Sequence, residues 1–327
     1  MLARNSDLKE AIDALTSFES QFNHQYHYPV VFLNNEPWTD EFKRGVSAIV
    51  SGQSIFDTIS PDLWGYPDHV DQEAARAHIN EQGDRGIIHA GQESYHHMCR
   101  FYSMKFYDHP AMQQFKWYWR LEPGISFECP ITFDPFAYMS RENKRYAYTI
   151  ALQEVGATVR SLYRVVSDYK DSMHIAPSSY WNALINRSWA PLPIRWLLRL
   201  APYRDINGDE WNLCHFWNNF EIADLDLFRK EDYRHMMEHL DKQGGFYTER
   251  WGDASVRSFA ATLLLKPEEI HYFGDDMCYC HGKFCSPGIN LLDGKTSCPA
   301  QRPVLEQDRK GTFNEMCHLR FRQASLI

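Results

Sequence analysis

Long apolar runs are missing from this 327-residue chain. No stretch approaches the roughly 18–20 apolar residues that a membrane helix needs, and no charged-then-apolar leader opens the sequence. Positive charge is also scarce, because 34 Lys and Arg residues face 43 Asp and Glu residues, for a net charge of −9. We therefore expect a soluble protein with no targeting signal and no general attraction to nucleic acid or anionic membranes.

Two common phosphate-binding motifs are absent as well. The chain contains neither Gly-x-Gly-x-x-Gly nor Gly-x-x-x-x-Gly-Lys-[Ser/Thr], which excludes a Rossmann dinucleotide fingerprint and a P-loop. It also has no internal repeat and no low-complexity linker, so we expect one domain. A phosphate group bound by so acidic a chain would need a metal ion or a local cation.

Cysteine, in contrast, is plentiful, with eight residues in all. Five of them crowd into the last fifty residues, where regular periodicity fades: Cys278, Cys280, Cys285, Cys298 and Cys317. This distribution favours disulfides that tie down a loop-rich tail. The alternative is a zinc site at residues 278–285, although its ligands lie closer together than in the usual paired spacing.

The first third of the chain alternates between strand and helix patterns. Apolar residues recur at helical spacing over residues 8–23, residues 29–33 form a short apolar strand, and Thr39 is placed to cap the next helix. Further along, we expect a strand near residue 55, helices over 71–80 and 93–107, and a short strand at 87–88. This alternation predicts a doubly wound α/β domain.

Beyond residue 120 the pattern loosens. Strands are expected at 125–132, at 146–152, within 211–228 and at 270–273, and helices over 157–168, 231–243 and 253–265, so mixed strand pairing is expected. Residues 178–209 form an insertion that carries the apolar segment 194–200. That segment suits a packed surface helix, with a membrane-surface helix as the alternative.

An aromatic strand at residues 117–121 stops at a carboxylate. The Pro-Gly pair that follows prevents the strand from continuing, so Glu122 is expected at its carboxyl end with its side chain facing a ligand, the alternative being an ordinary strand-to-turn junction. Polar clusters also follow apolar strands at Arg4-Asn5 and at residues 34–36. If the strands are parallel neighbours, the three clusters open on one edge of the sheet, where a nucleotide would lie. A histidine beside Glu122 would favour a manganese-like ion over calcium.

Two later segments, residues 212–226 and 244–253, mix aromatic side chains with carboxylates and amides. Sugar sites are built in this way, because aromatic faces cover the C–H surface of the ring while polar groups bind the hydroxyls. A dense aromatic core has the same composition and is the alternative.

Six blocks of the chain, in order, carry a family resemblance. They are Ser94-Tyr-His-His-Met-Cys-Arg-Phe101, Tyr118-Trp-Arg-Leu-Glu-Pro123, Tyr146-Ala-Tyr-Thr-Ile150, Asn212-Leu-Cys-His-Phe-Trp217, Asn219-Phe-Glu-Ile-Ala223 and Gly244-Gly-Phe-Tyr-Thr-Glu-Arg-Trp-Gly-Asp-Ala254. Together they closely resemble the fungal α-1,2-mannosyltransferases of glycosyltransferase family fifteen. The resemblance implies a GT-A-like α/β fold, with a mixed central sheet flanked by helices over residues 1–287 and a cysteine-containing tail at 288–327 packed on it.

The resemblance also implies the reaction: a retaining transfer of mannose from the donor GDP-mannose to the 2-hydroxyl of a mannose-terminated glycoprotein acceptor, with Mn²⁺ as the cofactor. By the same resemblance Glu122 and His281 are the metal ligands, Tyr95 lies beside the anomeric carbon, and Glu221 is the candidate nucleophile. The positions that match substrate-binding residues are Arg4, Asn5, Glu154, Trp217, Asn219, Arg250 and Asp253. Configuration could be retained either through Glu221 as a nucleophile or through attack beside Tyr95 from the face that GDP leaves.

The chain departs from the family pattern in three places. Gly124 stands where the family's Glu-Pro-Asp motif has Asp, the match of His281 needs a one-residue shift, and the sequence starts where the family has a complete first strand preceded by a stem and a membrane anchor.

The resemblance implies the Golgi lumen, with membrane attachment only through an anchor that is not in this sequence. The alternatives are a catalytically silent relative that binds mannose or nucleotide, and a metal hydrolase that uses a carboxylate pair.

Overall fold

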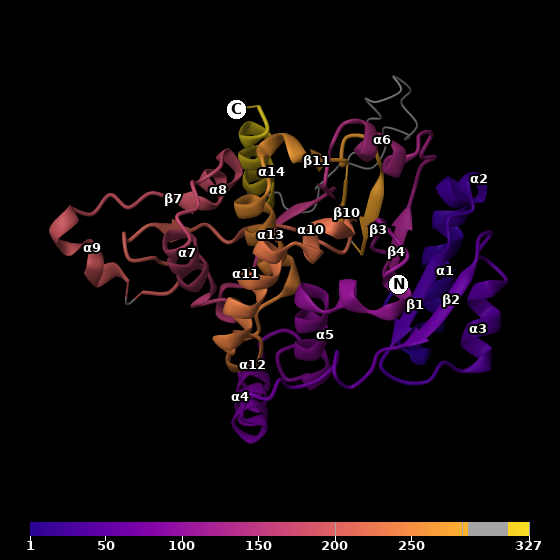
Figure 1. Ribbon diagram of the computed structural model, residues 1–327, viewed down its shortest axis with the longest axis horizontal. Coiled ribbons are helices and arrows are strands. Elements are labelled where there is room, and N and C mark those ends of the chain that lie inside the picture. The colour runs from indigo at the N-terminus through magenta and orange to yellow at the C-terminus, as the bar shows by residue number, and fades with distance from the viewer. Residues whose placement is uncertain (200, 283, 287–312, 327) are drawn as a thin grey trace.

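The computed structural model describes residues 1–199, 201–282, 284–286 and 313–326. Near the N-terminus, β1 (Val30–Asn34) and β2 (Ser54–Thr58) pair in parallel, and α1 (Leu8–Phe18) and α3 (Asp40–Ser47) pack together beside them, at the right of Figure 1. The hydroxyl of Thr39 accepts a hydrogen bond from the backbone N–H of Phe42 at 3.2 Å and begins α3, as predicted. Among all the residues that the structure describes, no helix is both long and apolar enough to cross a membrane.

The central sheet has mixed pairing, which confirms the sequence-based prediction. Its spatial order is β11 (Ile270–Tyr272), β5 (Tyr146–Tyr148), β10 (Ile222–Asp224) and β3 (Trp117–Trp119). Strand β10 runs antiparallel to both of its neighbours, whereas β11 and β5 are parallel. A second sheet pairs β12 (Tyr279–His281) with β4 (Ile125–Phe127) and with β13 (Phe284–Cys285). These pairings set His281 opposite Ile125, just beyond the turn that follows Glu122.

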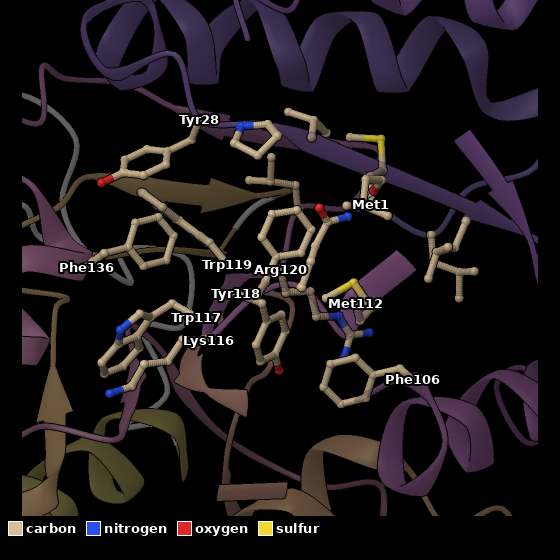
Figure 2. A pocket seen from close by; sticks show the side chains of 18 of the residues that line it. Met1, Tyr28, Phe106, Met112, Lys116, Trp117, Tyr118, Trp119, Arg120 and Phe136 are labelled. Atoms are coloured by element: carbon tan, nitrogen blue, oxygen red, sulfur yellow. Dashed lines mark hydrogen bonds between the residues drawn. The ribbon is translucent and has the colours of Figure 1, made fainter. Parts of the chain in front are cut away.

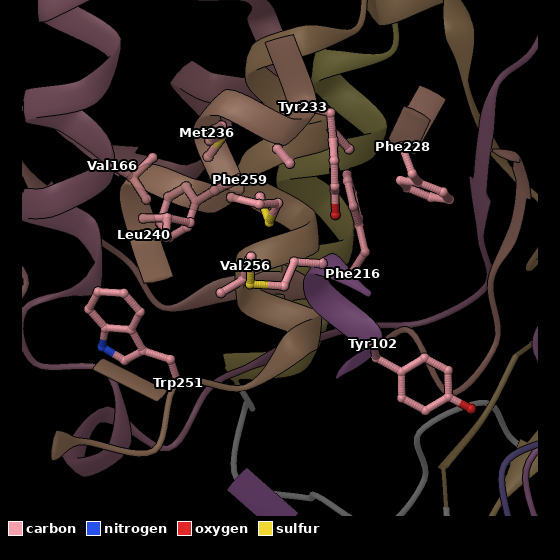
Figure 3. Packing of buried hydrophobic residues seen from close by; sticks show 14 of the residues in the cluster. Tyr102, Val166, Phe216, Phe228, Tyr233, Met236, Leu240, Trp251, Val256 and Phe259 are labelled. Carbon is pink, nitrogen blue, oxygen red and sulfur yellow. The ribbon is translucent and has the colours of Figure 1, made fainter. Parts of the chain in front are cut away.

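Helices make up most of the other half of the molecule, and α13 (Asp253–Leu264) lies at its centre. It packs against α5 (Glu93–Met104), α7 (Leu162–Ser172) and α11 (Glu231–Lys242). Nearly every residue of α13 is buried, because neighbours cover it on all sides. Figure 3 shows Val256 and Phe259 of this helix among Met236, Leu240 and Tyr233.

Other helices and strands complete the fold. They are α2 (His24–Tyr26), α4 (Gln72–Asp84), α6 (Pro135–Arg141), β6 (Ala151–Gln153), α8 (Ser179–Leu184), β7 (Ile185–Asn186), α9 (Leu192–Leu198), β8 (Glu210–Trp211), β9 (Cys214–Phe216), α10 (Leu225–Arg229), α12 (Gly245–Thr248) and α14 (Phe313–Ala324). The predicted insertion holds α8, β7 and α9, and α9 projects from the body of the molecule at the far left of Figure 1. Ile194 and Leu197 of α9 are each 48% exposed, so this helix is less closely packed than predicted.

One predicted strand is wrong, and the strand region predicted within 211–228 holds β8, β9 and β10 but ends in a helix. Residues 87–88 lie in a turn, because the backbone N–H of Ile87 bonds back to the carbonyl of Gln82 at the end of α4. Residues 225–229 are helical, since the side chain of Asp224 accepts a hydrogen bond from the N–H of Asp226 and caps α10. Residues 87–88 are a short apolar pair and residues 225–228 a short, mostly apolar run, so composition alone could not separate a strand from a turn or helix.

Disulfides do join tail cysteines, in line with the prediction. Cys317 of α14 is bonded to Cys214 of β9, and Cys280 is bonded to Cys285 across the β12–β13 pair. The second bridge uses two of the thiols that a zinc ion would need, so the zinc alternative is wrong. Cys298 and the predicted boundary at residue 287 lie outside the described residues.

The Cys214–Cys317 bridge is expected to contribute to stability, because it closes a loop with a sequence separation of 103. Replacing both cysteines with alanine should lower the free energy of unfolding by about 2–4 kcal/mol. The measurement is denaturant unfolding, with Cys99→Ala as the control, since Cys99 is an equally buried thiol outside any disulfide. An equal loss in the control would show that lost packing, rather than the bridge, accounts for the effect.

Candidate active site

A cleft of about 510 Å³ opens beside the end of β1. It brings together the polar groups that the sequence placed after three strands: Arg4, Asn34, Asn35 and Glu122. The sequence pattern predicts that they meet because their strands are neighbours in one parallel sheet. That reason is wrong, since β1 and β3 belong to different sheets. The rest of the lining is Leu2, Ala3, Asp7, Glu10, Trp64, His89, Gln92, Ser94, Tyr95, Met98, Tyr102, Pro123 and Gly124.

Behind this cleft, one buried guanidinium holds two carboxylates. Arg120 is 5% exposed; its Nε donates to Glu122 Oε1 at 2.7 Å, and its Nη1 donates to Asp253 Oδ2 at 2.5 Å. The guanidinium also lies 3.6 Å from the ring centroid of Tyr102. Burial alone would raise the pKa of Asp253, but Arg120 and a hydrogen bond from Asn218 bring this pKa below its usual value. Asp253 is therefore held ionised, and the guanidinium fixes the positions of both carboxylates.

Sequence reasoning missed Arg120. The available signal was a charged residue inside the aromatic strand pattern 117–121, where a buried cation requires a partner.

The two predicted metal ligands lie on either side of one amide. Asn219 Nδ2 is 2.5 Å from Glu122 Oε2 and 3.0 Å from His281 Nδ1. The indole of Trp217 stacks on the His281 ring, with the centroids 5.2 Å apart and the planes at 12°. Burial lowers the pKa of His281, so its imidazole is neutral and has a lone pair to offer.

This arrangement fits a manganese ion. A carboxylate oxygen and an imidazole nitrogen converge on one position, and this mixed donor set suits Mn²⁺ better than Ca²⁺. In the described part of the chain no group of three or more His, Cys, Asp or Glu side chains could hold a metal, so the protein would supply two such ligands. Gly124, at φ +85°, lies where an added Cβ would be 3.6 Å from His281 Nε2, so the Asp of the family motif would face this ring.

A second charged cluster lies behind Tyr95. Arg250 donates to the Tyr95 hydroxyl at 3.2 Å and forms an ion pair with Glu154 at 3.2 Å. The imidazole of His89 stacks on the Tyr95 ring, with 4.9 Å between centroids. Burial raises the pKa of Tyr95 far above its usual range, so its hydroxyl stays protonated. Of this cluster, Tyr95 and His89 line the cleft, while Arg250 and Glu154 hold Tyr95 in place from behind.

Of the predicted site residues, Arg4, Tyr95 and Glu122 line the cleft, and the groups described above lie beside or behind it: Glu154, Trp217, Asn219, Arg250, Asp253 and His281. Glu221 and Asn5 belong to neither set. Glu221 is completely buried, accepts a hydrogen bond from the Tyr146 hydroxyl at 2.8 Å and lies 3.3 Å from Arg257. It does not line the described cleft, so its role as nucleophile stays a prediction that would require its carboxylate to become accessible. Asn5 bonds the carbonyl of Pro37 and the N–H of Thr39 and so braces the loop before α3.

A separate groove of about 440 Å³ runs between β1 and β3. Figure 2 shows aromatic side chains around it, including Tyr28, Trp117, Trp119 and Phe136. Among the described residues that line it there is no carboxylate and no histidine. Glu122, Tyr95 and His89 line the polar cleft, which is therefore the candidate active site.

Comparison with known proteins agrees with this site. The family model described as glycolipid 2-α-mannosyltransferase matches residues 1–323. The chain is 41% identical over 319 residues to the O-glycoside α-1,2-mannosyltransferase homolog 4 of Schizosaccharomyces pombe, covering 89% of this chain and 70% of that protein. It is 40% identical over 300 residues to the α-1,2-mannosyltransferase KTR1 of Saccharomyces cerevisiae, covering 91% and 72% of the two chains.

Solved structures show the same fold. The S. cerevisiae mannosyltransferase Ktr4p in complex with GDP superimposes with a TM-score of 0.79 at 34% identity, covering 99% of this chain and 79% of Ktr4p. The Mn/GDP form of core-mannan synthase A from Aspergillus fumigatus gives a TM-score of 0.80 at 29% identity, covering 99% and 82%. The fold, the family match and the relatives agree, and the chain belongs to the glycolipid 2-α-mannosyltransferase family.

Proposed function

We propose that this protein is a retaining α-1,2-mannosyltransferase that moves mannose from GDP-mannose to the 2-hydroxyl of an acceptor mannose in mannoprotein glycans. The observation that carries the proposal is the convergence of Glu122 and His281 on one position at a cleft that also exposes Tyr95. The names of the relatives and the GDP in the Ktr4p structure support the reaction and the donor.

We place the manganese ion of the reaction between Glu122 and His281, and the Mn/GDP form of the Aspergillus relative supports this choice. When bound, the ion would neutralise charge on the diphosphate leaving group. Other side chains fix the positions of the two ligands: Arg120 donates a hydrogen bond to Glu122, and the indole of Trp217 stacks on the ring of His281. Arg4 lines the same cleft and is 74% exposed at its side chain, although it pairs with Asp7, so it can reach a phosphate.

For the retention of configuration, we propose attack by the acceptor from the face that GDP leaves, beside Tyr95. An ionised carboxylate is a better nucleophile than a tyrosine hydroxyl, but Glu221 is buried away from the cleft with Arg257 and Tyr146. The neutral Tyr95 hydroxyl can donate a hydrogen bond to a sugar or phosphate oxygen while Arg250 fixes its direction. Its role is then to position and stabilise the reacting groups.

We further propose that the protein works in the Golgi lumen. The Cys214–Cys317 and Cys280–Cys285 bridges support an oxidising compartment, because such bonds are rare in the reducing cytosol.

A second candidate is a silent relative that binds the nucleotide sugar without transferring the mannose. Gly124 favours it, since the family motif has an acid there. Mixing the protein with GDP-mannose, Mn²⁺ and methyl α-mannoside separates the two: transfer forms a disaccharide and releases GDP, whereas binding alone produces neither. A disaccharide linked through a hydroxyl other than the 2-hydroxyl would contradict the proposed specificity.

Glu122→Gln should weaken manganese-dependent GDP binding at least tenfold. The unfolding free energy should change little, because Arg120 keeps its second partner, Asp253. Calorimetric titration of GDP with Mn²⁺ present is the measurement, and Glu231→Gln on an exposed helix surface is the control. If Glu122→Gln binds GDP as the parent does, the metal assignment is wrong.

Tyr95→Phe should lower kcat by about a hundredfold, as expected for loss of one electrostatic donor near the reacting atoms. The affinity for GDP should stay within a few-fold, since the phenylalanine ring can still stack on His89. Steady-state kinetics and GDP titration measure the two quantities. The control is Tyr28→Phe, whose hydroxyl bonds Asp134 by the apolar groove. A Tyr95→Phe variant with parental kcat would remove Tyr95 from the mechanism.

Glu221→Gln should make stability less dependent on pH. Burial raises the pKa of Glu221 to about 8, against about 4.3 in an unfolded chain. Between these values the folded protein keeps a proton that the unfolded chain has lost, so the contribution of Glu221 to the free energy of unfolding falls as pH rises. Glutamine does not titrate, so the variant should lack this fall.

The measurement is urea unfolding at several pH values across that window, with the exposed Glu238→Gln as the control. A Glu221→Gln protein with the parental pH dependence would contradict the proposed protonation. A variant that is stable but has no turnover would return Glu221 to the mechanism as the nucleophile.

A further inference from the structure

The side chain of Asn219 lies at the point that the two predicted metal ligands share. Glu122 Oε2 and His281 Nδ1 are 2.5 and 3.0 Å from the same amide nitrogen. A carboxylate only accepts hydrogen bonds, so the NH₂ group, not the amide oxygen, must face Glu122. Its two hydrogens can serve one ligand each, which leaves the proton of His281 on Nε2, on the side of Gly124.

From this geometry we infer that Asn219 competes with the divalent cation for its site. The inference rests on the proposed manganese site and adds a role for a residue that holds no metal. The amide N–H donor and the cation would both bind the lone pairs of Glu122 Oε2 and His281 Nδ1. They cannot both occupy the space between these two atoms. The amide must turn or withdraw before the ion binds, and this requirement weakens binding of the ion.

Other contacts already hold the two ligands, so Asn219 is not needed to position them. Arg120 binds the opposite oxygen of Glu122, at 2.7 Å through Nε. Trp217 stacks on the face of His281. The neighbouring Asn218 contrasts with Asn219, since it is buried and donates to Asp253 rather than to a metal ligand. Removing the Asn219 amide should therefore free the lone pairs without releasing the groups that carry them.

The test measures binding of Mn²⁺ alone, without nucleotide, from the electron paramagnetic resonance signal of the free ion. Asn219→Ala should bind Mn²⁺ about tenfold more tightly than the parent, because it lacks the competing donor. Asn219→Asp, which replaces the donor by an acceptor of the same size, should bind at least as tightly and should gain thermal stability when Mn²⁺ is added. Asn182→Ala, at an exposed site, should match the parent.

The outcomes separate this inference from the proposed function. Unchanged or weaker Mn²⁺ binding in Asn219→Ala overturns the competition. Tight binding that persists in the double variant Glu122→Gln/Asn219→Ala would place the ion elsewhere and overturn the metal site itself. If Asn219→Ala does not fold, Asn219→Leu decides, since leucine keeps the size of the side chain, lacks the donor and adds no ligand.

Discussion

The candidate site depends on one buried positive charge, the guanidinium of Arg120. It is the shared partner of Glu122, beyond the end of β3, and of Asp253, at the first turn of α13. Removing it would leave two carboxylates in a buried region with no cation between them, which is among the most destabilising changes that a protein can undergo. The same contacts connect the sheet to the helical half of the molecule, so this charge network contributes both to the fold and to the site.

A second buried pair, Glu221 and Arg257, shows why burial and a shifted pKa do not by themselves mark a catalytic group. Both side chains are almost completely enclosed, and aromatic rings cover Arg257, with Phe228 at 4.0 Å from the guanidinium. Structural ion pairs shift pKa values in the same way as active-site groups do. Access separates the two cases here: Tyr95 and Glu122 line the cleft, and Glu221 does not.

The disulfides lie close to the site in the chain. Cys214 is at the start of β9, three residues before Trp217, and its bond to Cys317 fixes α14 against this strand. Cys280 precedes His281 directly, and its bond to Cys285 closes the β12–β13 turn. Each bridge therefore restrains the backbone next to a residue of the predicted metal site, and this restraint helps to keep the ligand geometry in place before any ligand arrives.

The sequence by itself determined much of this protein. The family blocks, the mixed sheet, the cap at Thr39 and the oxidation of tail cysteines could be predicted, because strand ends, caps and motif order are encoded by neighbouring residues and the cysteines cluster in the sequence. Arg4, Asn34 and Glu122 do meet at one cleft, but they come from different sheets rather than from one parallel sheet. Only the tertiary structure decided that Arg120 joins Glu122 to Asp253, that Asn219 lies between Glu122 and His281, and that Glu221 faces the core. These contacts join residues 62 to 133 positions apart, or depend on which side of a strand faces the cleft, and no local pattern of residues specifies either.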